Sequence, residues 1–360
     1  MLYAKWYYKI MNVNEKKRYI IYLNVIATFA VVLWHINDGI YSVSDNLSWR
    51  ITVAVDSFVY FSVPVLFMIT GANLIGYKER GVSLKEYFIR RIRKTFIPFL
   101  FWSLVFIAYY ARNEIKAYIV SGNIIQLMLF VLESIFSYKY YTAFWFFIYL
   151  FVIYLAIPII ALVPERSRKR VFSVAAIAAF AVAYVAPFIF NILKIDFPIN
   201  GSRFFLFVIC GYLIDKYEMK RSLRIILYCL GLLALAIHYF GTVSYSLAVN
   251  ELNSTFRAKD GLINCLYTIA IFTFFKYSGE KLFNKAEKVF NFFNRYTFGI
   301  YILHIFVLNE ILPIIGIRLY DPNTNHIVMY PVAFVVIITI CILATWVFSK
   351  IPLLKKVLPQ

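Results

Sequence analysis

The feature that most constrains this chain is a series of long apolar runs that carry no charged residue. Residues 19–36, 57–75 and 328–348 are three of them, and each is close to the roughly 20 residues that a helix needs to cross a bilayer. A membrane β-barrel would instead need segments of roughly ten residues with alternating hydrophobicity. Because backbone polar groups in lipid must be satisfied within the protein, the runs predict an all-α polytopic transmembrane helical bundle.

Composition agrees with lipid as the surrounding medium. Apolar residues make up 62% of the 360 residues and charged residues 15%, whereas soluble domains average about 25% charged residues. The formal net charge of +19 would otherwise raise the question of nucleic-acid binding, because basic chains neutralise phosphates. In a membrane protein the distribution of the cations along the chain is more informative than their sum.

The hydropathy pattern predicts about ten transmembrane helices in one membrane-embedded domain, residues 1–360, with no soluble domain. The expected spans are residues 19–36, 57–76, 95–111, 144–163, 171–193, 203–215, 222–241, 261–276, 297–315 and 328–348. The apolar segment Ile124–Phe136 is short for a span and contains Glu133, so we interpret it as an interfacial or re-entrant helix.

The positions of Lys and Arg predict the orientation of the bundle. Ten spans with the N-terminus in the cytoplasm place 28 of the 37 basic residues on the cytoplasmic side, as the positive-inside rule requires. Both termini are then cytoplasmic. Orientation accounts for most of the positive charge, and a nucleic-acid partner is not expected.

Several kinds of site have no support in the sequence. The four cysteines lie inside apolar runs without paired spacing, so neither disulfides nor a metal site is expected. Phosphate-binding glycine loops and Gly-x-Ser-x-Gly elbows are also missing from the sequence. The first apolar run is too long for a cleavable signal peptide and has no cleavage site after it.

Ionisable groups inside a membrane are costly, and they are therefore candidates for function. His35 lies near the outer end of the first span and is followed by Asp38, which suits a general base and the carboxylate that orients it. The alternative is an interfacial histidine in an aromatic belt beside Trp34. His304 lies in the ninth span, where a site role and a hydrogen bond to a neighbouring helix are both open interpretations.

Further polar residues are candidates by position. The cluster Arg90, Arg91, Arg93 and Lys94 opens the third span, where it can hold an anionic ligand such as a phosphate or simply anchor the topology. Candidates for lining a cavity are Asn24, Asp56, Arg203 and Glu310.

Six motifs occur in an order that resembles acyltransferase family 3, the integral membrane O-acyltransferases. They are the segments Tyr22–His35, Ser62–Gly71, Tyr87–Ser103, Phe144–Phe146, Phe207–Tyr212 and Phe298–His304. Each motif is weak alone, but the six are spread across nearly the whole chain in the order expected for the family. The fourth motif adds Trp145 to the candidate cavity residues.

The resemblance implies a multi-pass O-acyltransferase of the bacterial cell membrane. It would move an acyl group, usually acetyl, from cytoplasmic acyl-coenzyme A to a hydroxyl of a cell-surface polysaccharide or lipid-linked glycan, with no permanently bound cofactor. His35 would be the catalytic histidine, with Asp38 orienting its ring. The coenzyme A phosphates would be held by Arg90 and Arg93 or, in the shifted register, by Arg91 and Lys94.

Two positions depart from the family pattern. Asn24 stands where relatives usually have Arg or Lys, eleven residues before His35, and Ala143 stands where relatives often have a histidine. Asn24 leaves open a catalytically silent scaffold of a glycan-synthesis complex. A transporter or exporter of a polysaccharide unit is a second alternative, because it would also need polar groups within the membrane. The acceptor sugar and the oligomeric state are left open.

Overall fold

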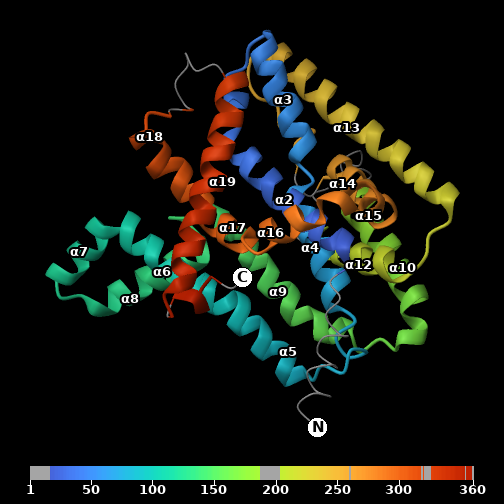
Figure 1. Cartoon of the computed structure of the whole chain (residues 1–360), viewed down its shortest axis with the longest axis horizontal. Helices are drawn as coiled ribbons and strands as arrows, with labels where there is room; N and C mark the ends of the chain where they lie inside the picture. Colours follow the sequence, from blue (N-terminus) through green and yellow to red (C-terminus); the bar gives the residue numbers. More distant parts are fainter. Residues whose placement is uncertain are drawn as a thin grey trace.

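The computed structural model describes residues 17–186, 203–258, 261–317, 319, 326–352 and 354–358, and in these residues every regular element is helical. Figure 1 shows their arrangement. The main helices are α2 Arg18–Ile36, α3 Leu47–Val59, α4 Ser62–Leu74, α5 Leu84–Arg91, α6 Ile97–Tyr110, α7 Arg112–Val120, α8 Ile124–Ser137, α9 Trp145–Ile160, α10 Glu165–Phe180, α12 Arg203–Lys216, α13 Arg221–Val249, α14 Leu262–Phe274, α15 Glu280–Phe283, α16 Glu287–Asn294, α17 Thr297–Phe306, α18 Leu312–Ile314 and α19 His326–Lys350. Short 3-10 or π turns complete them: η1 Asp38–Tyr41, η2 Ile92–Phe96, η3 Thr142–Phe144, η4 Ala181–Val185, η5 Phe275–Gly279, η6 Asn284–Ala286, η7 Val307–Ile311 and η8 Leu354–Lys356.

Seven helical segments among the described residues are long and apolar enough to cross a membrane, and each overlaps one of the predicted spans. The segments predicted at 171–193, 203–215 and 261–276 correspond to the shorter helices α10, α12 and α14, of 16, 14 and 13 residues. Residues 187–193 lie outside the described residues. The protein is thus a multi-pass helical membrane protein, while the count of ten and the orientation of its termini stay predictions.

The second spanning segment begins earlier than the sequence predicted. The expected span was 57–76, but the helical segment is Leu47–Leu74, interrupted by a turn at Tyr60 and Phe61. The predicted span followed the uncharged apolar run, which begins after Asp56. The helix extends through Asp56 because the carboxylate is buried and paired with Arg257, so its charge does not face lipid.

The centre of the bundle is a close crossing of α4 and α12. A Cβ atom on Gly71 would lie 1.8 Å from the carbonyl oxygen of Val208, and one on Gly211 would lie 2.1 Å from that of Met68. Two glycines thus allow the two backbones to touch, as small residues do in membrane helix pairs. The crossing fixes α4, which carries one wall of the site described below.

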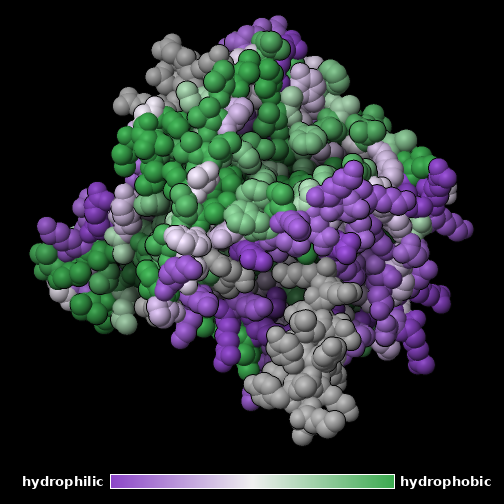
Figure 2. Space-filling view, viewed as in Figure 1, coloured by the Kyte–Doolittle hydropathy of each residue, from purple (hydrophilic) through white to green (hydrophobic). Residues whose placement is uncertain are grey.

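Loops that the sequence assigned to one side of the membrane meet at one end of the bundle. Arg168 is buried and pairs with Glu79 at 2.7 Å, Lys216 pairs with Glu165 at 2.9 Å, and Asp215 binds the side chains of both Lys17 and Tyr19. Figure 2 shows hydrophilic residues gathered over this end, in the lower half of the view, with an apolar surface above it. We call it the basic end; whether it faces the cytoplasm stays a prediction.

Helix α8 corresponds to the segment predicted as interfacial or re-entrant. It is an apolar helix of 14 residues, too short to be counted among the candidate spans. Together with α7 it projects from the side of the bundle (Figure 1). Large apolar side chains on it are exposed, including Ile125, Met128 and Leu129, which is compatible with contact with lipid at a membrane surface.

Candidate active site

A pocket lies beside His35, near the end of α2 that is opposite the basic end. It holds about 340 Å³ of empty space, part of it open to the surroundings. Its walls come from five parts of the fold: α2, the turn between α3 and α4, the start of α4, α9 and α17. The lining residues are Val31, Trp34, His35, Tyr60, Ser62, Val63, Trp145 and Tyr301. The pocket thus combines one imidazole with aromatic walls and few other polar groups.

His35 belongs to the last turn of α2, which ends at Ile36. The Trp34 ring and the His35 imidazole pack edge to face, with ring centroids 4.7 Å apart. On another side lies the imidazole of His304 from α17, at 5.1 Å between ring centroids. Two histidines that are 269 positions apart in the chain, one half-buried and one fully buried, are therefore neighbours. Both histidines were candidates from the sequence, but their contact was not predicted.

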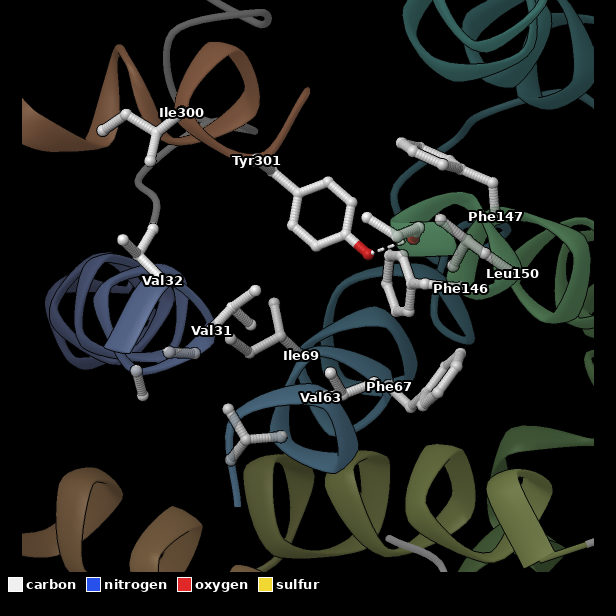
Figure 3. Packing of buried hydrophobic residues seen from close by; sticks show 14 of the residues in the cluster. Val31, Val32, Val63, Phe67, Ile69, Phe146, Phe147, Leu150, Ile300 and Tyr301 are labelled. Carbon is white, nitrogen blue, oxygen red and sulfur yellow. Dashed lines mark hydrogen bonds between the residues drawn. The ribbon is translucent and has the colours of Figure 1, made fainter. Parts of the chain in front are cut away.

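Tyr301 forms the wall between α17 and α9. Its hydroxyl donates a hydrogen bond to the carbonyl oxygen of Ala143 at 2.8 Å, and Figure 3 shows the side chain extending toward Phe146, with Val31 and Val63 nearby. This hydrogen bond uses the backbone oxygen of Ala143, so it does not depend on which side chain stands at position 143. The alanine side chain itself is buried.

Tyr60 forms the opposite wall and is held by a polar cluster. Its hydroxyl donates to the carbonyl oxygen of Arg257, its own carbonyl accepts from Asn264 at 3.1 Å, and its ring packs edge-on against His238 at 5.0 Å. Asp56 lies within the same cluster, bonded to the Arg257 guanidinium. Sequence analysis named Asp56 but missed Tyr60, His238 and Arg257.

Asn24 lies three turns before His35 on α2, about 16 Å away by helix rise. Its side-chain amide donates hydrogen bonds to Asn294 at 2.9 Å and to Thr297 at 3.1 Å. In this chain the position therefore ties α2 to the end of α16 and the start of α17. A neutral side-chain amide has two N–H donors, which suits these two neutral acceptors.

The other predicted residues are spread over the fold. Asp38 begins the 3-10 turn after α2, and Arg203 stacks over the Tyr184 ring at 5.5 Å. Glu310 accepts a hydrogen bond from Tyr109 at 2.9 Å. None of these three belongs to the pocket lining.

The basic cluster of the third span lies on α5 and η2, at the start of a helical segment that continues to Tyr110. Arg90 pairs with Glu86 one turn earlier. Arg91 is half-buried, with its guanidinium 5.6 Å from the centre of the Tyr154 ring, and its Nε has no hydrogen-bond partner among the described residues. Arg93 and Lys94 are exposed.

Comparison with known proteins identifies the chain. Residues 17–347 match the family model described as an acyltransferase domain, and they include all six motifs and every candidate residue. The chain belongs to acyltransferase family 3. Comparisons with curated proteins and with solved structures return no significant match. As a member of this family the protein is a membrane acyltransferase, and the pocket beside His35 is the natural candidate for its active site.

The candidate site and its surroundings contain residues that the sequence did not single out. Tyr301 is one helical turn from His304, so a search along the same helix face would have found it. Tyr60 stands just before the Ser62–Gly71 motif, but one tyrosine among 29 carries no signal of its own. Arg257 lies in a polar segment, where a charge is ordinary. Its burial depends on a partner far away in the chain.

Proposed function

We propose that this acyltransferase moves an acetyl group from acetyl-coenzyme A to a hydroxyl of a cell-surface polysaccharide or of its lipid-linked precursor, in the bacterial cell membrane. The observation that carries the proposal is the imidazole of His35 in an aromatic-walled pocket. Imidazole is the side chain best suited to proton transfer near neutral pH. Aromatic walls suit a small acyl group and the apolar faces of a sugar.

The reaction needs one proton to be moved twice. His35 accepts the proton of the acceptor hydroxyl while that oxygen attacks the thioester carbonyl carbon. The new carbon–oxygen bond forms, the carbon–sulfur bond breaks, and the thiolate takes the proton from the imidazolium to leave as coenzyme A. The acetylated hydroxyl and the free thiol are the products, and His35 returns to its starting state.

The donor would bind through its phosphates at the basic end. Guanidinium groups grip phosphate oxygens in pairs, and the α5–η2 segment presents Arg90, Arg91, Arg93 and Lys94 there. His35 is 16 residues beyond Tyr19 on α2, about 24 Å by helix rise, and Tyr19 bonds to Asp215 at the basic end. The thioester would therefore have to enter the bundle to reach His35.

Reconstituted protein tests this function directly. Liposomes that contain the protein should transfer radiolabel from acetyl-coenzyme A to at least one of a panel of neutral glycans. His35→Ala should abolish the transfer while the variant still inserts and unfolds at the same temperature as wild type. Asp38→Asn is the companion variant, because it removes only the carboxylate predicted to orient the ring.

The outcomes separate the functional classes. Full activity in His35→Ala would refute the site assignment. A wild-type protein that transfers no label to any acceptor would favour the scaffold or the exporter over the enzyme. Mass spectrometry of surface glycans from cells with and without the gene then identifies the acceptor, as a difference of one acetyl mass.

A further inference from the structure

The tautomer of His304 follows from its hydrogen bonds. Its Nδ1 lies 2.7 Å from the carbonyl oxygen of Tyr301 and 3.1 Å from that of Ile300. Backbone carbonyl oxygens only accept hydrogen bonds, so Nδ1 must carry a proton. In the neutral ring Nε2 is then an unprotonated nitrogen with a lone pair.

The lone pair of Nε2 has no partner among the described residues. The residue is 1% exposed, so bulk water does not reach the atom. Buried polar atoms are nearly always hydrogen-bonded, and an orphan in a native structure calls for an explanation. A protonated Nε2 would be worse, because it would leave an unpaired charge in an apolar interior.

The His35 ring lies at the distance that would satisfy this nitrogen. A hydrogen bond between two imidazole nitrogens spans roughly 3 Å, and adding the distance from each nitrogen to its ring centre gives roughly 5 Å. The observed separation of the two centroids is 5.1 Å, with the ring planes at 53°. At this separation, an N–H of His35 that points toward Nε2 of His304 lies within hydrogen-bond reach.

We propose that His304 is the positioning residue of His35, with Nε2 of His304 accepting a hydrogen bond from the protonated ring nitrogen of His35. The other His35 nitrogen is then unprotonated, and it is the atom that takes the proton of the acceptor hydroxyl. The same bond stabilises the imidazolium that forms when His35 takes a proton. This inference rests on the proposed function, and it gives His304 the orienting role that the sequence had assigned to Asp38.

Two substitutions separate this role from a structural one. The side-chain amide of His304→Asn reproduces the Nδ1 donor toward the two carbonyl oxygens but offers nothing at the Nε2 position. The longer His304→Gln places an amide oxygen near Nε2 and loses the local donor. We expect kcat to fall about 100-fold in His304→Asn, the lower end of what general acid–base catalysis contributes, because His35 remains but is no longer oriented. We expect a fall of less than tenfold in His304→Gln, with KM for donor and acceptor unchanged in both variants. Wild-type activity in His304→Asn, or a His304→Gln variant that is no better than a folded His304→Asn, would overturn the proposal.

A measurement that needs no activity tests the same bond. Nitrogen NMR of histidine-labelled protein should show one ring protonated at Nδ1 and not at Nε2, which the His304→Asn variant assigns by its disappearance. The Nε2 resonance of this ring should move in His35→Ala. A proton on Nε2, or a resonance that ignores the loss of His35, would refute the inference even if acetyl transfer were confirmed. The predicted shift would support it even if no acceptor were found.

Discussion

Asp56 of α3 and Arg257, which follows α13, form a buried bidentate ion pair, with both nitrogen–oxygen distances at 2.9 Å. Burial works against the charge of Arg257, but its hydrogen bonds and ion pair with Asp56 outweigh burial and raise the pKa of the guanidinium above its usual range. His238 lies 3.6 Å from the same carboxylate. Because the carbonyl of Arg257 also binds the Tyr60 hydroxyl, the ion pair holds one wall of the pocket.

Loss of this ion pair should destabilise the protein strongly. Asp56→Ala leaves a buried guanidinium without its counter-charge, which costs about 3–5 kcal/mol in proteins. Thermal unfolding in detergent should show a large fall in midpoint. The matched control is Asp45→Ala, which removes the exposed pair with Arg50, where the two side chains are 65% and 41% exposed. Such an exposed, solvent-screened pair contributes little to stability, so equal shifts in the two variants would contradict the prediction.

The close crossing of α4 and α12 should not tolerate added side-chain volume at its glycines. In Gly71→Ala or Gly211→Ala the new methyl group would overlap a backbone oxygen of the other helix, so α4 and α12 must separate. We expect poorly folded protein from either variant, measured as the monodisperse fraction after extraction. Gly76→Ala is the control, since its Cβ would meet only the ends of the Glu79 and Arg80 side chains, at 3.3 and 3.4 Å. A monodisperse Gly71→Ala protein would show that the crossing adapts.

Trp145 should limit the length of the acyl group. It lines the pocket beside His35 and packs against Tyr149 and Phe204 at 5.7 and 5.8 Å between ring centroids, so truncation opens space at the proposed reaction site. Trp145→Ala should raise the kcat/KM ratio of butyryl- to acetyl-coenzyme A by about tenfold or more, the scale at which a pocket discriminates one methylene. Trp346→Ala, on α19 and 49% exposed, should leave the ratio unchanged.

The sequence predicted a membrane-spanning helix correctly wherever a long run of apolar residues has no charge within it. The turn at Tyr60 and Phe61 was missed because the apolar run continues through it, although Pro64 lies in the first turn of the helix that follows. The start of the same segment was also missed. Asp56 reads as a charge that ends a span until its partner is known, and that partner lies 201 positions later in the chain.

The site was predictable only for residues that are rare in lipid. His35 and His304 stand out because a histidine in an apolar helix is unusual. Each also ends one of the motifs on which the resemblance to the family rests. Tyr60 and Tyr301 are two of many tyrosines, so their selection required the packing of α17 against α9 and of α3 near α13. The hydrogen bonds of Asn24 to Asn294 and Thr297 likewise depend on the contact of α2 with α16 and α17.

Cysteine labelling should establish the predicted orientation. Ser42 and Ser254 are exposed in loops predicted to lie outside, and Lys85 and Lys220 are exposed in segments predicted to lie inside. In a background without the lipid-exposed Cys229, an impermeant reagent added to whole cells should label Ser42→Cys and Ser254→Cys. It should reach Lys85→Cys and Lys220→Cys only after lysis. Labelling of Lys220→Cys in intact cells would contradict the prediction and would mean that the orientation is reversed or that the number of spans differs from ten.

Of the two possible pairs of phosphate-binding residues, we expect the pair that contains Arg91, with Lys94, to bind the donor. Arg90 is already paired with Glu86, whereas the Arg91 guanidinium is half-buried and fixed over Tyr154, so less of its freedom is lost when it binds a phosphate. We therefore expect the double variant Arg91→Gln and Lys94→Gln to raise KM for acetyl-coenzyme A more than the double variant Arg90→Gln and Arg93→Gln. A rise of about tenfold or more at unchanged kcat corresponds to one lost charge-assisted hydrogen bond. Lys85→Gln, on the same helix, controls for general loss of positive charge. An equal rise in KM in this variant would indicate that the cluster serves only to fix the membrane topology.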